Sequence, residues 1–505
     1  MIEITGADLS LETCAKVASM GSRVTLDESA RARMKESRDF ILDLLGAGER
    51  VYGVTTGFGR LAEIMVPEED REDLQHNLIR SHSSGVGDPM NKKEVRIIML
   101  LRANSLARGH SGCRGEVVDL LIDFLNRGIH PVVPQYGSVG ASGDLAPLAH
   151  IGLALIGEGD VEYQGQIRPT AEILDEVHLV PLKLKEKEGL ALINGTQATT
   201  GLGILTFLGA QNALDTAEVT GCMSLEALRG TPDPFMEEVQ HARPHPGQIE
   251  SAAKLRRLLQ NSEIRESHRE GDSRVQDPYC LRCMPQVHGA TRNVMKYVEE
   301  VLQVEANSTT DNPLIFTEIE SVVSAGNFHA QIVSQALDFL SISLTDMAAI
   351  SERRIERMLN PDVSGLPAFL APRPGLESGF MIVHVTVVDL LSEMRVLSHP
   401  ASVDSVPTSA GQEDHVSMGL TSARKASRIL RCLEYILAIE SLVAAEGIQY
   451  HRPMKAGDGV EKAHRVVREY AASLETDRSH SKEIEKLREV VGGGAFAAIL
   501  QADEV

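Results

Sequence analysis

The sequence predicts a mainly α fold: a bundle of long helices joined to a smaller, mixed N-terminal region. Two observations support this expectation. Apolar residues recur with a period near 3.6 over long stretches, as in residues 332–348 and 423–445. Strand signals are few and short by comparison, as in residues 161–163, which precede a Gln164-Gly165 turn.

Further helices follow from the same apolar period, in residues 93–108, 115–127 and 199–228. Helices of this length are atypical of a small domain and typical of a bundle. We therefore expect two parts. Residues 1–195 form the N-terminal region with most of the glycine-rich motifs, and residues 196–505 form the long-helix bundle with a helical tail.

The bulk composition is that of an ordinary globular protein. The 505 residues are 43% hydrophobic and 24% charged. Lys and Arg number 50 and Asp and Glu number 71, a net charge of −21 that argues against nucleic acid or an anionic membrane as partner. The first residues lack a secretory pattern, and Glu440 interrupts the best apolar run, residues 435–445. We expect a cytoplasmic protein.

The six cysteines are scattered, and a chain of this length does not need disulfides to fold. Cys280 and Cys283 form a Cys-x-x-Cys pair, but neither a second pair nor a histidine cluster accompanies them. Because a structural zinc site usually needs four such ligands, we expect no metal centre.

The most informative motif is Gly140-Ala141-Ser142-Gly143-Asp144, which an apolar stretch follows. Small residues alone would indicate only a turn, with Asp144 as the N-cap of the next helix. The complete motif also has a chemical logic. Gly143 leaves its nitrogen unobstructed and tolerates a strained backbone, Ala141 is small, and Ser142 carries a hydroxyl that can be eliminated.

This motif resembles the self-processing loop of the aromatic amino acid ammonia-lyases and aminomutases. The resemblance implies that the Gly143 nitrogen attacks the Ala141 carbonyl carbon and that two waters leave, so that residues 141–143 become a methylidene-imidazolone (MIO). MIO is an electrophile that no ordinary side chain supplies, and no external cofactor is expected. The implied fold is the aspartase/fumarase-like helical bundle, assembled as a homotetramer with shared active sites.

A glycine-rich loop with one tyrosine occupies residues 51–59. Its glycines do not follow the spacing of a dinucleotide-binding loop. A lone tyrosine is often a buried aromatic side chain, but the family resemblance implies that Tyr52 removes the β-proton of the substrate. A phenol with a pKa of about 10 needs help to ionise near neutrality.

Further motifs match the family in the expected order over most of the chain. Asn194 resembles the residue that touches the MIO carbonyl or the substrate amine. Arg282 is expected to bind the substrate α-carboxylate, because a guanidinium can do so bidentately. The other matched positions are Tyr279, expected in catalysis, and Gln276, Asn312 and Phe328, expected in substrate binding.

Two segments point to histidine as the substrate. Ser81-His82 resembles the ring-contacting pair of the histidine-specific members of the family, and residues 412–415 resemble them too. Members that act on other aromatic amino acids have an amide where this chain has Glu413. A carboxylate can accept an imidazole N–H, so we expect His82, Glu413 and Met381 to surround an imidazole.

Other residues favour different substrates. Some tyrosine aminomutases also carry Ser-His at the ring position, and residues 242–248 and 330–332 depart from the histidine-specific pattern. Loss of ammonia from L-histidine to give trans-urocanate is the main expectation. The alternative is a tyrosine or phenylalanine ammonia-lyase or 2,3-aminomutase with the same MIO group. A further alternative, from a different class, is a helical assembly or binding protein with a disused loop. Its intact mass would distinguish it, because an unprocessed loop keeps the two waters that a processed loop loses.

Overall fold

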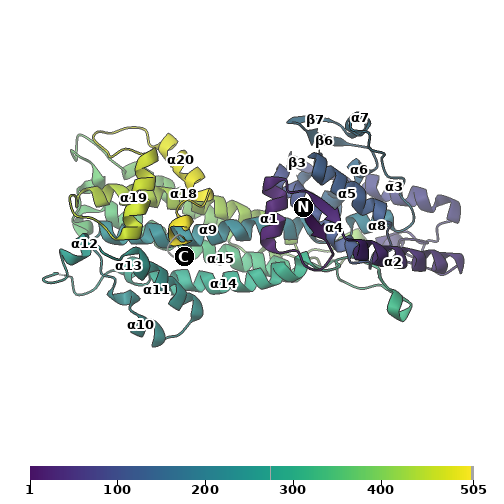
Figure 1. The fold of residues 1–505 in the computed structure, drawn as a ribbon, viewed down its shortest axis with the longest axis horizontal. Coiled ribbons are helices and arrows are strands. Elements are labelled where there is room, and N and C mark those ends of the chain that lie inside the picture. The colour runs from purple at the N-terminus through teal and green to yellow at the C-terminus, as the bar shows by residue number, and fades with distance from the viewer. Residues whose placement is uncertain (273, 502–505) are drawn as a thin grey trace. The chain divides into compact units, whose positions relative to one another are not determined.

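The computed structural model describes residues 1–272 and 274–501 (Figure 1). The chain forms two compact units, each assembled from segments that are discontinuous in sequence. Unit 1 comprises Met1–Leu205, Glu299–Asp338 and Pro400–Arg424, and unit 2 comprises Thr206–Val298, Phe339–His399 and Lys425–Val505. The domain boundary that the sequence suggests at residue 195 stays a prediction.

The mainly α prediction is confirmed. The longest helices of the described residues are α9 (Gln197–Ala227), α14 (Met284–Ala306), α15 (Gln331–Leu359) and α18 (Gly419–Gln449). The apolar period located α9, α15 and α18 correctly, and it also located α4 (Lys92–Ala107) and α5 (Gly115–Arg127).

Within unit 2 the long helices lie side by side (Figure 1). One buried carboxylate joins three of them. Glu440 of α18 accepts hydrogen bonds from Thr220 (3.0 Å) and Ser224 (2.8 Å) of α9. It also accepts from Ser351 (2.7 Å) and Arg354 of α15. The residue that interrupts the apolar run of α18 is therefore buried and satisfied.

The fourth long helix joins unit 2 through polar contacts of the same kind. Arg292 of α14 lies 2.9 Å from Glu218 of α9, and both side chains are largely buried. No described helix combines the length and the apolar character that crossing a membrane requires. The shorter helices of unit 2 are α10 (Glu237–His241), α11 (Pro246–Leu258), α12 (Glu263–Glu266), α13 (Tyr279–Arg282), α16 (Pro361–Ser364), α17 (Met381–Leu397), α19 (Asp458–Tyr470), α20 (Ser481–Gly492) and α21 (Ala497–Gln501).

Unit 1 mixes short strands with helices. The strands β4 (His130–Pro131), β6 (Asp160–Tyr163) and β7 (Gln166–Pro169) form an antiparallel sheet. The predicted Gln164-Gly165 turn joins β6 to β7, and its φ values of 51° and 85° suit a type I′ hairpin turn.

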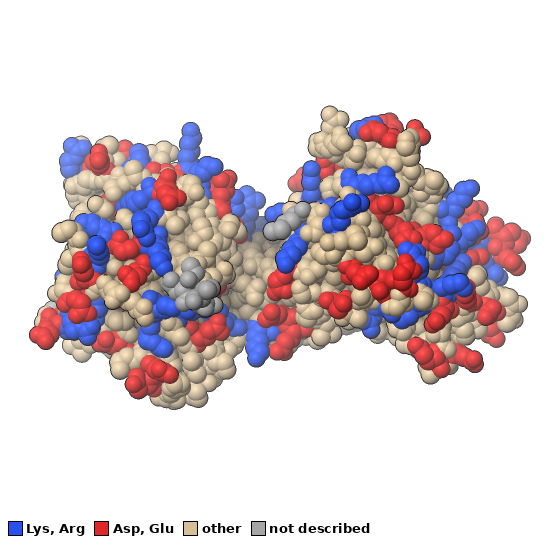
Figure 2. All heavy atoms as spheres, in the orientation of Figure 1, with Lys and Arg blue, Asp and Glu red and all other residues tan. Residues whose placement is uncertain are grey.

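The other strands of unit 1 form two-stranded sheets. These pairs are β1 (Ile2–Ile4) with β2 (Val24–Leu26), β3 (Val86–Pro89) with β5 (Pro134–Tyr136), and β8 (Leu314–Phe316) with β9 (Ser321–Val323). The remaining helices are α1 (Leu11–Met20), α2 (Glu28–Gly46), α3 (Arg71–His82), α6 (Leu145–Leu155), α7 (Thr170–Glu176) and α8 (Glu188–Ile193). Figure 2 shows acidic and basic side chains interspersed over the visible face.

Candidate active site

A cavity of about 470 Å³ lies within unit 1, and four residues expected in the active site line it: Tyr52, His82, Ser142 and Glu413. Its volume lies in the usual range for sites that bind small molecules. Much of the remaining wall is apolar, with Phe58, Leu61, Leu74, Leu78, Leu145, Leu190 and Ile193. The fold therefore brings together four chemical groups that are far apart in the sequence.

Ser142 lies between β5 and α6 in a backbone conformation that L-residues rarely adopt. Its φ is 54°, and Gly140 and Gly143 beside it have φ values of 77° and 84°. A Cβ atom on Gly143 would lie 2.5 Å from the carbonyl oxygen of Gly195. Position 143 therefore requires glycine both for its backbone angle and for lack of space.

Asp144 occupies the N-cap position of α6, but its carboxylate does not cap that helix. It accepts hydrogen bonds from the backbone N–H (2.7 Å) and hydroxyl (3.0 Å) of Thr199 and from the hydroxyl of Ser138 (2.8 Å). Asp144 is thus the N-cap residue of α6 by position, as the sequence indicates, while its carboxylate caps α9, in whose first turn Thr199 lies. Burial raises the pKa of Asp144, and these hydrogen bonds oppose that shift.

Asn194 follows α8 and contacts the loop directly. Its Oδ1 accepts a hydrogen bond from the Ser142 hydroxyl at 2.9 Å, and its Nδ2 donates to the Asn312 carbonyl oxygen at 2.8 Å. Asn194 is fully buried and Asn312 nearly so. The structure thus connects three of the predicted residues through hydrogen bonds.

Tyr52 lies in the loop that precedes the 3-10 helix η1 (Gly59–Leu61). Its hydroxyl oxygen accepts a hydrogen bond from the Gly59 N–H at 3.0 Å, and its ring meets Phe58 edge-on, with centroids 6.4 Å apart. Burial raises the pKa of Tyr52, the Gly59 bond lowers it, and the charge of Glu413 raises it. The Tyr52 phenol is therefore protonated at neutral pH.

His82 and Glu413 present two hydrogen-bonding groups on the cavity wall. His82 Nδ1 lies 2.9 Å from the Leu78 carbonyl oxygen, which can only accept, so we infer that Nδ1 carries the proton and Nε2 accepts. Burial lowers the pKa of His82 and keeps the ring neutral. Glu413 Oε2 accepts from the hydroxyls of Thr408 (2.8 Å) and Ser409 (2.6 Å).

Several groups of the site were not predicted from the sequence. They are the Gly59 amide, the two hydroxyls that hold Glu413, and the apolar side chains of Leu190 and Ile193. Thr408 and Ser409 stand within five positions of Glu413, and this proximity is the one signal that could have identified them.

Apart from Ala141 and Gly143, which flank Ser142 in the loop, five predicted residues lie outside both the cavity lining and the hydrogen bonds around Ser142. Phe328 belongs to unit 1, next to His329, whose ring contacts the His415 carbonyl at 3.1 Å. Tyr279 is 71% exposed, and the Arg282 guanidinium lies 4.7 Å from its ring centroid. The four residues that belong to unit 2 are Gln276, Tyr279, Arg282 and Met381.

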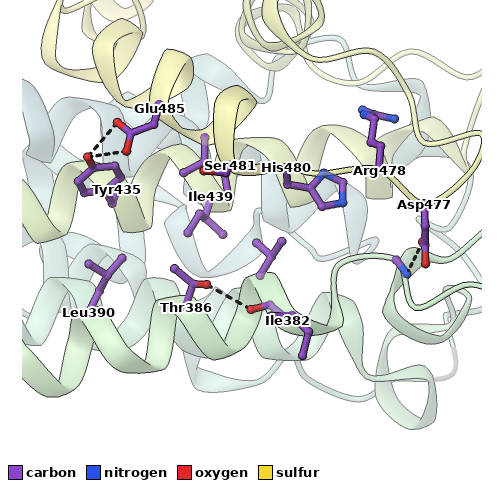
Figure 3. A pocket seen from close by; sticks show the side chains of 13 residues that line it. Ile382, Thr386, Leu390, Tyr435, Ile439, Asp477, Arg478, His480, Ser481 and Glu485 are labelled. Atoms are coloured by element: carbon purple, nitrogen blue, oxygen red, sulfur yellow. Dashed lines mark hydrogen bonds between the residues drawn. The ribbon is translucent and has the colours of Figure 1, made fainter.

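A second cavity, of about 510 Å³, lies in unit 2 and is lined by residues of α17, α18 and α20 (Figure 3). Its apolar wall includes Ile382, Leu390 and Ile439. The Tyr435 hydroxyl donates to the Glu485 carboxylate, with distances of 3.0 and 2.9 Å to its oxygens. None of the predicted site residues lines this cavity, so the cavity in unit 1 is the candidate active site.

Known proteins of one family resemble this chain over its whole length. The aromatic amino acid lyase family model matches residues 9–469. A histidine ammonia-lyase of Myxococcus xanthus is 49% identical over 99% of this chain and 98% of its own length. The crystal structure of histidine ammonia-lyase from Trypanosoma cruzi has a TM-score of 0.92 at 39% identity, covering 99% and 95% of the two chains. The crystal structure of tyrosine aminomutase from Streptomyces globisporus has a TM-score of 0.94 at 37% identity, and the match covers 99% of this chain and 98% of that one.

Gly143→Ala is expected to abolish processing of the loop, because its Cβ would collide with Gly195 and because alanine disfavours the left-handed backbone. Intact-protein mass spectrometry should find the variant at its encoded mass and the unaltered chain two waters lighter. Gly165→Ala is the matched control, since its φ of +85° is close to the +84° of Gly143 but no atom would lie within 4 Å of the added Cβ. A Gly143→Ala protein two waters lighter than encoded would contradict the geometry.

Proposed function

The chain belongs to the aromatic amino acid lyase family, and within that family we propose that it is a histidine ammonia-lyase, which converts L-histidine into trans-urocanate and ammonia. The cavity that unites Ser142 with His82 and Glu413 carries this proposal. Curated relatives named histidine ammonia-lyase, 46–49% identical over nearly the whole chain, favour histidine over the tyrosine and phenylalanine alternatives.

The proposal includes formation of MIO from Ala141, Ser142 and Gly143. When formed, this group supplies an electrophilic methylidene carbon that takes up the substrate amine and makes ammonia a better leaving group. The loop fits the group, since the Gly195 backbone leaves no room for a side chain at position 143 and Ser142 already has a strained, left-handed backbone. Asn194 binds the hydroxyl that must be lost.

Substrate choice follows from His82 and Glu413, two of the polar residues on the cavity wall. An imidazole can donate its N–H to Glu413 or to Nε2 of His82, and the Glu413 carboxylate stabilises positive charge on the ring. A phenyl ring offers no donor and would leave both groups unpaired. Since Thr408 and Ser409 hold one oxygen of Glu413, the carboxylate is fixed before substrate enters.

Tyr52 is the group we assign to removal of the β-proton. It lines the same cavity as Ser142, and the Gly59 N–H donates to its oxygen, which stabilises the phenolate. Burial works in the opposite direction and raises the pKa of Tyr52. The fraction of enzyme in which Tyr52 is deprotonated should therefore increase with pH.

We further propose a cytoplasmic homotetramer in which several copies build each site. Arg282, which is suited to the substrate carboxylate, belongs to unit 2 and lies beside the exposed Tyr279. Helix α17 exposes the apolar side chains of Ile382 (65%), Val385 (56%) and Val388 (45%). Exposed apolar surface on one helix face is typical of a contact between protein chains.

Glu413→Gln tests the assignment of the substrate. We expect kcat/KM for L-histidine to fall about 100-fold, because the carboxylate that accepts the imidazole N–H and stabilises its charge is lost. Any turnover of L-phenylalanine should change by less than about threefold, because its ring has no donor. Glu172→Gln, on the exposed face of α7, is the control. Equal losses for both amino acids would contradict the role of Glu413.

The pH dependence tests Tyr52. Because the pKa of Tyr52 is raised, the phenolate fraction and kcat/KM should increase roughly tenfold per pH unit between about pH 7 and pH 9. Tyr52→Phe should lower kcat by at least about 100-fold while the purified protein is still two waters lighter than encoded. A variant with undiminished kcat would exclude Tyr52 as the base.

Mixed oligomers test the shared site. Ser142→Ala and Arg282→Leu chains should each be inactive alone, but co-expressed chains should regain activity. If the two groups of one site come from different chains, random mixing leaves about one quarter of the sites intact. Rates and mixing ratios can be measured on tagged, co-purified oligomers. Mixed oligomers without activity would show that both groups come from one chain.

A further inference from the structure

A fully buried ion pair lies one hydrogen bond away from the Asn194 amide. Lys187 Nζ donates to Asp311 Oδ2 at 2.8 Å, and both side chains are 0% exposed. Removing two charges from water opposes folding, and an apolar pair of similar size is often at least as stable. Stability alone is therefore a weak reason for charges at this position.

The second oxygen of Asp311 faces Asn194. Asp311 Oδ1 accepts from Asn194 Nδ2 at 3.3 Å and from the backbone N–H of Asn312 at 2.7 Å. The same Nδ2 also donates to the Asn312 carbonyl oxygen at 2.8 Å. Both acceptors lack a hydrogen to donate, so they determine which end of the Asn194 amide faces them.

The remaining end of the amide is its oxygen, and it points to the loop. Asn194 Oδ1 lies 2.9 Å from Ser142 Oγ, so the serine hydroxyl must donate. Reversing the amide would place Oδ1 against Asp311 Oδ1 and the Asn312 carbonyl oxygen, where like partial charges repel. The Asp311 carboxylate thus determines that Ser142 meets an acceptor and not a donor.

The backbone around Asn194 is held just as firmly. Lys187 and Asn194 are the residues immediately before and after α8, so the ion pair fixes one end of this short helix and the amide contacts fix the other. Lys187 has φ 72°, which is unfavourable for any residue but glycine. Arg102, also fully buried, donates to the Asn194 carbonyl oxygen at 3.2 Å.

We propose that Asp311 and Lys187 are positioning residues for loop processing: they hold the Asn194 oxygen toward Ser142 and so keep the serine hydroxyl in one orientation. This inference rests on the proposed function, because processing of the loop is the source of the electrophile. Neither residue lines the candidate active-site cavity, so both act through Asn194.

Processing forms one ring bond and releases two waters. The Gly143 nitrogen bonds to the Ala141 carbonyl carbon, and the Ala141 oxygen leaves as water with the hydrogens of the Gly143 and Ser142 nitrogens. The second water takes the Ser142 hydroxyl and its Cα proton, and the electron pair of that C–H bond forms the Cα=Cβ double bond. The C–O bond of Ser142 must hold one orientation for this elimination, and the Asn194 oxygen holds it.

Asp311→Asn tests the proposal with almost no change of shape. An amide at position 311 would turn its oxygen to Lys187 and its NH₂ to Asn194, so that Asn194 reverses to avoid two facing donors. We expect loop processing to slow about tenfold, the factor that one charge-assisted hydrogen bond contributes. The measurement is intact mass at timed intervals after synthesis, which gives the fraction of folded chains that have lost two waters.

Two further variants separate positioning from general damage. Lys187→Met leaves Asp311 without its cation and should slow processing too, so it decides the outcome if Asp311→Asn does not fold. Glu440→Gln is the matched control, because it removes one carboxylate of a fully buried ion pair in unit 2 and should be processed at the unaltered rate. Thermal unfolding of all variants shows whether their stability losses are comparable.

The outcomes distinguish this inference from the proposed function. If the unaltered chain has its encoded mass, loop processing itself does not occur and the proposed function fails. If the unaltered chain is two waters lighter and the folded Asp311→Asn and Lys187→Met variants are processed at the same rate, the positioning role is overturned. Slow processing in both, with normal processing in Glu440→Gln, supports it.

Discussion

The close approach of the backbones at Gly143 and Gly195 is the constraint on which the candidate site depends. No Cβ fits on Gly143, and the Asp144 N–H donates to the Gly195 carbonyl oxygen at 2.7 Å. Through this contact the strained loop packs against the junction of α8 and α9. Because Asn194 precedes Gly195, the same contact also brings the amide to the serine hydroxyl. Asp144 then caps α9 and completes the attachment.

Near this contact, burial sets the charge state of two groups that line the cavity. His82 is neutral and Tyr52 is protonated, because both are partly removed from water. Among the charged groups that are fully buried near this contact, Lys187 and Asp311 pair with each other. A site with a neutral imidazole, one fixed carboxylate and a phenol suits proton abstraction from a substrate whose ring donates hydrogen bonds.

The sequence was sufficient to locate three of the four longest helices and to name residues that the fold brings together around one cavity. Apolar periods are local, so α9, α15 and α18 could be located, and the residues around Ser142 follow from a contiguous motif. The capping of α9 by the Asp144 carboxylate could not be predicted, because Thr199 stands 55 residues away and only the fold brings it near. The hydroxyls that hold Glu413 and the ion pair of Lys187 with Asp311 depend on tertiary contacts, to which no periodicity points.

The most direct test of the account is a product assay of the purified protein with L-histidine, L-tyrosine and L-phenylalanine, in which products are identified by mass and ammonia is counted. The account predicts trans-urocanate and ammonia in equal amounts from histidine, and little product from the other two. A β-amino acid, or cinnamate or coumarate as the main product, would keep the processed loop but contradict the assignment of His82 and Glu413 to an imidazole.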